Sequence, residues 1–172
     1  MKKILVLLLM MLSISLLLTS CFFIMPTANV YDGPVDSGKP QEFSKDGITL
    51  TLTDEFIEKE SEMGFDAYYV APYGAVMILK EEFTLEEGLE DRTLEDYIAN
   101  VIENNGHDIE PIHDHDLLYY YNDKTMMGED IRYYSFVYKG DDAFWIVQFS
   151  CFSKDLQEME PQIMTWAKSV VV

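Results

Sequence analysis

Three histidines lie within ten consecutive positions, and two aspartates adjoin the last of them: His107, His113, Asp114, His115 and Asp116. Two histidines two positions apart share a face of an extended segment, and a third could reach them from the end of the preceding helix. Together they would suit a transition metal. Zinc sites usually follow tighter spacing rules, so a solvated acidic loop ahead of a strand is the alternative. The sequence leaves both interpretations open.

A second concentration of oxygen ligands lies in residues 81–96, which hold eight acidic residues against the single basic Arg92. Carboxylates at this density could bind Ca²⁺, which takes six to eight oxygen ligands. However, the segment has no D-x-[DN]-x-[DN]-G loop, and runs of charge are usually solvated faces. We therefore interpret this segment as a solvated face.

Cys151 could act as a nucleophile if a histidine and an aspartate lay beside it. Strand alternation instead places it on the same face as Trp145, Val147 and Phe149, which predicts a small buried side chain rather than an activated thiol. The sequence has no G-x-S-x-G, P-loop, G-x-G-x-x-G or H-E-x-x-H motif. We therefore expect neither catalysis nor a cofactor.

Six tyrosines are concentrated in two neighbouring strand-like segments, 117–121 and 131–139. The half that faces outward would form an aromatic surface with phenol hydroxyls, suited to a protein or glycan partner. We assign Tyr119, Tyr121 and Tyr134 to this surface. Tyrosine is also an ordinary residue at the edge of a core, so that alternative stays open.

The N-terminus combines two lysines, an apolar run over residues 4–18 and the closing Leu18-Thr19-Ser20-Cys21. This order is typical of a secretory signal peptide. The last four residues resemble the lipobox of bacterial lipoproteins, whose cysteine receives a lipid before cleavage. An uncleaved signal anchor is the alternative, because residues 22–25 extend the apolar run. Both interpretations place the rest of the chain outside the cytoplasm.

The charge balance restricts the partners. The chain carries 12 basic and 31 acidic residues and a formal net charge of −19 at pH 7. Such a surface repels phosphate backbones and anionic headgroups, which excludes nucleic-acid binding through a basic footprint. The expected partners are the membrane, through lipid at Cys21, and an envelope protein or glycan. The expected location is the extracytoplasmic face of the cell membrane.

The spacing of apolar residues divides the chain into a leader (1–20), Cys21 with a Pro- and Gly-containing flexible tether (21–42) and one domain (43–172). Within the domain, strand-like alternation begins at Gly47, and Pro72-Tyr73-Gly74 predicts a hairpin turn. A helix is predicted after Thr93, which together with Asp96 suits an N-cap. A second helix is expected to begin within one turn of Pro161, because proline inside a helix costs about 3 kcal/mol. Residues 144–149 are apolar on both sides, which predicts a central strand.

These elements indicate an α+β fold, with two helices on a mostly antiparallel sheet. The chain resembles the group of folds shared by the photosystem protein PsbP and the Ran-binding protein Mog1. The resemblance is carried by Gly47-Ile48-Thr49-Leu50, Lys80-Glu81-Glu82-Phe83, Leu94-Glu95-Asp96-Tyr97, Phe144-Trp145-Ile146-Val147 and Trp166-Ala167-Lys168-Ser169. It implies an α/β/α sandwich around an antiparallel sheet and favours a binding or accessory role.

Taken together, the sequence predicts a membrane-anchored extracytoplasmic lipoprotein that binds rather than catalyses. The alternative is a metal-binding lipoprotein that uses His107, His113 and His115. The pattern of residues identifies no particular ligand.

Overall fold

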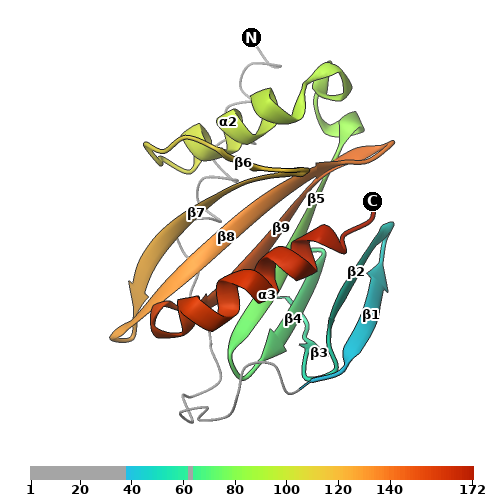
Figure 1. The fold of residues 1–172 in the computed structure, drawn as a ribbon. Coiled ribbons are helices and arrows are strands. Elements are labelled where there is room, and N and C mark those ends of the chain that lie inside the picture. Colours follow the sequence, from blue (N-terminus) through green and yellow to red (C-terminus); the bar gives the residue numbers. More distant parts are fainter. Residues whose placement is uncertain (1–37, 62–63) are drawn as a thin grey trace.

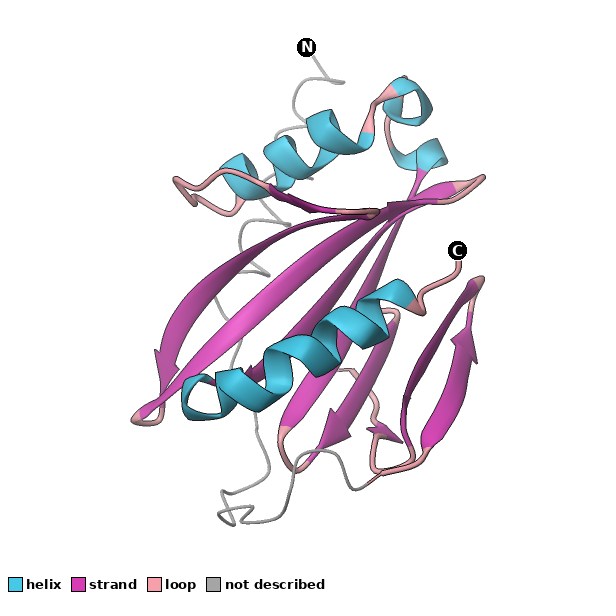
Figure 2. Cartoon of the chain, viewed as in Figure 1, coloured by secondary structure: helices cyan, strands magenta, loops and turns pink. Residues whose placement is uncertain are grey.

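Alternating apolar residues form most strands, and the helices follow where the apolar spacing changes from two residues to three or four. The computed structural model describes residues 38–61 and 64–172, so the expected leader, Cys21 and most of the tether lie outside the described residues. These residues form a long twisted sheet, a short separate hairpin and two α-helices, whose arrangement can be followed in Figures 1 and 2. None of the helices in this described part has the length and apolar character that crossing a membrane requires.

The main sheet has seven antiparallel strands in the order β3-β4-β5-β9-β8-β7-β6. Its strands are β3 (Ile57–Glu58), β4 (Ala67–Ala71), β5 (Gly74–Glu82), β6 (Ile112–Asp114), β7 (Leu117–Met126), β8 (Glu129–Lys139) and β9 (Ala143–Phe152). The segment expected to be central is β9, which lies in the middle of this order. A separate hairpin joins β1 (Pro40–Lys45) to β2 (Ile48–Thr53).

The helices cover opposite faces of the sheet. On β9, the neighbours Phe144 and Trp145 point into different core clusters, because side chains alternate along a strand. Helix α3 (Leu156–Lys168) packs over Trp145 and Val147, and α2 (Leu94–Asn104) packs over Phe144 and Val137. The predicted α/β/α sandwich with an antiparallel sheet is therefore confirmed.

Three short 3-10 turns complete the part of the chain that the structure describes: η1 (Phe83–Leu85), η2 (Leu89–Asp91) and η3 (Ser153–Asp155). Two local predictions are confirmed. The β4–β5 hairpin turns at Pro72-Tyr73, and the Thr93 hydroxyl caps α2 by accepting the backbone N–H of Asp96 at 3.1 Å.

Two predicted boundaries are wrong. Strand β1 begins at Pro40, ahead of Gly47, where strand-like structure was expected to begin, because residues 40–45 pair with β2 and the Phe43 ring packs 4.9 Å from the Tyr69 ring. Proline is tolerated there as the first residue of an edge strand. Helix α3 begins at Leu156, so Pro161 lies inside it. Proline removes one helical hydrogen bond, and burial of Met159 and packing of Leu156 offset that loss.

Candidate functional site

A groove crosses the α2 side of the sheet, beside the part that α2 covers. Its cavity volume is about 350 Å³, and strands β5, β7, β8 and β9 form its floor. The apolar floor and walls include Met77, Leu79, Ile146, Tyr133 and Val101. Concave, mostly apolar sites with a few polar groups are the usual form of small-molecule sites, which range from about 300 to 1,000 Å³.

The sheet register explains why these side chains meet. Met77 pairs with Gln148, Gln148 with Ser135, and Ser135 with Tyr120, so four strands contribute one row to the same face. Within this row the Gln148 amide donates to the Ser135 hydroxyl at 2.8 Å. Burial raises the pKa of Tyr120, and its hydrogen bond with Ser135 opposes that rise. The apolar floor therefore contains a short, paired polar strip.

The C-terminal cap of α2 places His107 at the rim of the groove. Gly106 adopts a left-handed conformation (φ 69°), and its N–H bonds to the Glu103 carbonyl at 2.9 Å. The N–H of His107 then bonds to the Ile102 carbonyl at 3.1 Å, which completes a Schellman motif. The His107 ring lies 5.8 Å from the Tyr120 ring.

Burial, and next the nearby Lys124, lower the pKa of His107 below its ordinary value. The imidazole is therefore mainly neutral at pH 7. Since an anion favours the charged form of an imidazole, an anion bound at this rim would oppose the lowering of the pKa of His107.

Lys124 is the cation at the open side of the groove. Its ammonium lies 5.7 Å from the centre of the Tyr133 ring, a cation–π arrangement. Strand alternation places the adjacent Asp123 on the opposite face, where its carboxylate accepts two hydrogen bonds from Arg132 at 2.7 and 2.8 Å. In the part of the chain that the structure describes, no carboxylate lies within 4.0 Å of the Lys124 ammonium.

The predicted metal ligands are not brought together. His113 is exposed on β6, and its strand ends at Asp114. His115 lies in the following turn with φ 56°, and its Nδ1 is 2.7 Å from the Asp114 carboxylate, so it does not continue the face of His113. Asp116 is exposed in the same turn. Across residues 38–61 and 64–172, no three His, Cys, Asp or Glu side chains form a group that could hold a metal.

The expected tyrosine surface is wrong at two of its three positions. Tyr119, Tyr121 and Tyr134 do share a face, but it is the face that α3 covers. Tyr119 and Tyr134 are buried in that core, whereas Tyr121 is 39% exposed beneath the Arg132 guanidinium. The reason is that helices cover both faces of the sheet, so the alternation of side chains along a strand does not by itself identify a solvent-exposed face. On the α2 side, Tyr120 and Tyr133 instead line the groove.

The structure confirms that Cys151 is buried on the face of Trp145, Val147 and Phe149. Burial raises the pKa of its thiol to about 12, and the charge of Asp155 contributes. A thiol with this pKa is almost entirely protonated at pH 7, which is the opposite of an activated nucleophile.

Acids of residues 81–96 serve local structure. The Tyr97 hydroxyl donates to Glu81 at 2.7 Å, and Arg92 pairs with Glu86 at 2.6 Å. Asp96 accepts a hydrogen bond from the capping Thr93 hydroxyl at 3.0 Å. Three of the eight carboxylates of this segment are therefore held in local contacts.

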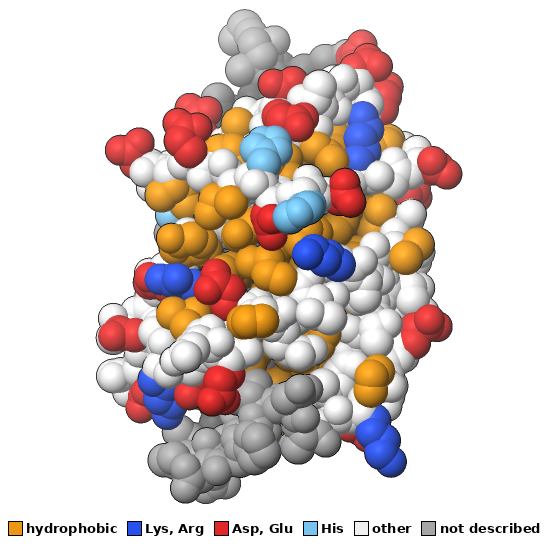
Figure 3. Space-filling model, in the orientation of Figure 1, with side chains coloured by type: hydrophobic (Ala, Val, Ile, Leu, Met, Phe, Trp, Pro, Cys, Tyr) orange, Lys and Arg blue, Asp and Glu red, His pale blue; other side chains and the backbone are white. Residues whose placement is uncertain are grey.

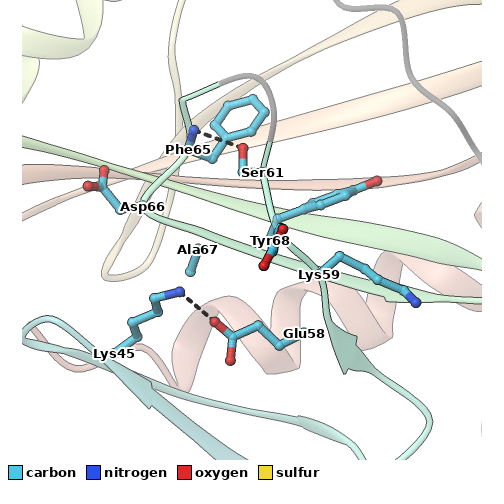
Figure 4. A pocket seen from close by; sticks show the side chains of 9 residues that line it. Lys45, Glu58, Lys59, Ser61, Phe65, Asp66, Ala67 and Tyr68 are labelled. Carbon is cyan, nitrogen blue, oxygen red and sulfur yellow. Dashed lines mark hydrogen bonds and ion pairs between the residues drawn. The ribbon is translucent and has the colours of Figure 1, made fainter.

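A second hollow adjoins the first at Phe65, which lines both. Its cavity volume is about 570 Å³, and its lining is more polar than that of the groove. In Figure 4 the Lys45 ammonium points to the Glu58 carboxylate, while the Lys59 side chain extends away from this pair. Because its facing charges are already paired, we take the apolar groove as the candidate site.

Figure 3 shows the opposite face of the domain, on which α3 lies. Acidic side chains lie mostly around its margin, and hydrophobic side chains gather across its middle. The core beneath this face is closed by α3, whose residues Met159, Ile163 and Ala167 are fully buried. The two faces therefore differ: one is sealed by a helix and the other retains a groove.

Sequence reasoning missed the groove. Met77 and Ile146 were expected in strands, but no pattern indicated that α2 leaves the sheet beside them open. One signal was present, since Gln148 interrupts the otherwise apolar segment 144–149. A polar residue at such a position is unusual in a fully packed core.

No family model matches the chain, and no curated protein matches it in sequence. Solved structures do match it. A protein of Bacteroides thetaiotaomicron is 13% identical to this chain, with a TM-score of 0.53. The match covers 78% of this chain and 48% of that protein, so this chain spans about half of that protein's length. At this identity the likeness shows the fold alone.

Two further matches belong to the groups named by the resemblance. The Ran-binding protein Mog1p of Saccharomyces cerevisiae is 10% identical, with a TM-score of 0.49 and coverage of 79% of this chain and 96% of that chain. The cyanobacterial PsbP of Synechocystis is 14% identical, with a TM-score of 0.41 and coverage of 81% and 96%.

Proposed function

We propose that this chain is a lipid-anchored, extracytoplasmic binding module of the cell envelope that acts without catalysis and holds an apolar ligand in the groove on the α2 side. The observation that carries the proposal is the groove itself. It combines an apolar floor of Met77, Leu79 and Ile146 with polar groups at its rim. Such a surface gains free energy when a ligand covers it, at about 25 cal/mol per Å² of apolar area.

The anchored location is supported by the N-terminal pattern, with two lysines, an apolar run and a lipobox ending at Cys21. A flexible tether of about twenty residues spans about 25 Å on average, which would set the domain just off the bilayer. Catalysis is not part of the proposal because Cys151 is buried with a protonated thiol. The metal-binding alternative is left out because the described residues contain no group of three potential ligands.

Binding of the neutral apolar dye diphenylhexatriene tests this proposal, because the dye becomes fluorescent when it leaves water. The wild-type chain should give saturable fluorescence with one site. Ile146→Trp, which fills the groove from its floor, should abolish it. Val171→Trp adds the same indole at an exposed position and should leave it unchanged. Absence of saturable binding by the wild type, or equal binding by both variants, would contradict the groove as the site.

A further inference from the structure

The ratio of acidic to basic residues in the lining of the groove differs from the ratio in the whole chain. Acids outnumber bases 31 to 12 overall, yet the groove lining contains one acid, Glu81, and two lysines, Lys80 and Lys124. The Glu81 carboxylate accepts a hydrogen bond from the Tyr97 hydroxyl, and the Lys80 ammonium pairs with Asp142 at 2.8 Å. This leaves Lys124 as the cation of the lining without a carboxylate partner in the described part of the chain.

Lys124 lies at the mouth of the groove, where the polar head group of a bound ligand would lie. Asn122 and Lys124 alternate with Asp123, so both point to the groove face, and Lys124 lies over Tyr133 at the mouth. His107 lies close enough for the Lys124 charge to affect its titration. The mouth therefore offers a cation, an imidazole and an amide beside an apolar floor.

Resting on the proposed function, we propose that the ligand of this groove is a single-chain anionic amphiphile of the fatty-acid type. Its carboxylate lies at Lys124, and its hydrocarbon chain lies along Met77, Leu79 and Ile146. A carboxylate accepts charge-assisted hydrogen bonds from an ammonium, and the chain covers the apolar floor. The cavity of about 350 Å³ is near the lower end of the range for small-molecule sites, which fits one chain better than two.

The negative charge of the whole chain does not oppose this binding at close range. At physiological ionic strength the Debye length is about 8 Å, so exposed acids farther away are largely screened. The groups within that distance decide the sign of the local field. Among the charged residues of the lining, Glu81 is hydrogen-bonded to Tyr97 and Lys80 is paired with Asp142, which leaves the charge of Lys124 uncompensated there.

The test is displacement of diphenylhexatriene from the full chain by three probes with the same twelve-carbon chain: dodecanoate, dodecanol and dodecyltrimethylammonium, each below its micelle-forming concentration. Dodecanoate should displace the dye at a concentration about twofold to fivefold lower than the cationic probe, a ratio that one exposed ion pair can supply. Lys124→Gln should remove most of this preference, and Lys124→Glu should reverse it.

Lys154→Gln is the matched control, because Lys154 also lies over an aromatic ring, that of Phe152 at 5.1 Å, and does not line the groove. It should retain the preference for dodecanoate. Equal displacement by all three probes, or a preference that survives Lys124→Gln, would overturn the fatty-acid inference and leave the proposed function standing. Failure of the dye and all three probes to bind would overturn both.

Discussion

Replacing Gly106 with alanine should destabilise the protein by about 1 kcal/mol and release His107 from the groove rim. Gly106 has φ 69°, a conformation that costs an L-residue about 1–2 kcal/mol. A Cβ there would meet no atom within 4 Å, so no steric clash adds to this cost. Alanine also restricts the unfolded chain, which recovers about 0.4–1 kcal/mol. The net loss is therefore about 1 kcal/mol.

Urea unfolding of the wild type, Gly106→Ala and Gly106→Asn measures this difference. Asparagine tolerates the left-handed conformation, so Gly106→Asn should retain more stability than Gly106→Ala. Gly88→Ala is the matched control: Gly88 has φ 84° and equally open surroundings, so it should lose similar stability without changing the NMR signals of His107. If Gly106→Ala were as stable as the wild type, or if its His107 signals were unchanged, the cap would not position the imidazole.

Four further predictions follow from single residues. Gly74→Ala should cost about 3 kcal/mol in urea unfolding, since its Cβ would lie 2.3 Å from the backbone oxygen of Ser150; a cost under 1 kcal/mol would contradict this close pairing. Native Cys151 should resist thiol reagents until the protein unfolds, and rapid labelling would contradict its burial. Folding lowers the pKa of His107 below 6.5, so the unfolded chain takes up the proton first as the pH falls. The free energy of unfolding should therefore keep its full value above pH 6.5 and decrease as the pH drops from there towards the lowered pKa. His107→Gln should reduce this decrease in unfolding experiments from pH 7.5 to 5. Cys21→Ala should remove the lipid mass and detergent partitioning of the mature protein, and unchanged processing would contradict lipidation.

The spacing of residues within a short stretch of sequence was sufficient to predict those elements that depend on neighbouring residues alone. The Thr93 cap, the Pro72-Tyr73 turn and the central strand β9 each depend on residues that are neighbours in sequence, and each is confirmed. The start of α3 was wrong because the cost of Pro161 is offset by long-range packing of Leu156 and Met159, which a local window does not include.

The candidate site could not be predicted in the same way. The groove depends on how far α2 extends across the sheet, and that is set by packing between residues far apart in the chain. His107 was singled out for its chemistry, but its place beside Tyr120 follows from the cap of α2. Lys124 gave no signal, because the polar residues 122–125 have no apolar alternation to show that they continue strand β7.

The central claim, that the groove on the α2 side is the binding site, is tested most directly by methyl NMR of the chain during titration with dodecanoate. The signals of Met77 and Ile146, on the groove floor, should shift with saturation. Those of Met159 and Ile163, buried beneath α3 on the other face, should stay in place. Shifts confined to Met159 and Ile163, or no saturable shift at Met77 and Ile146, would contradict the account.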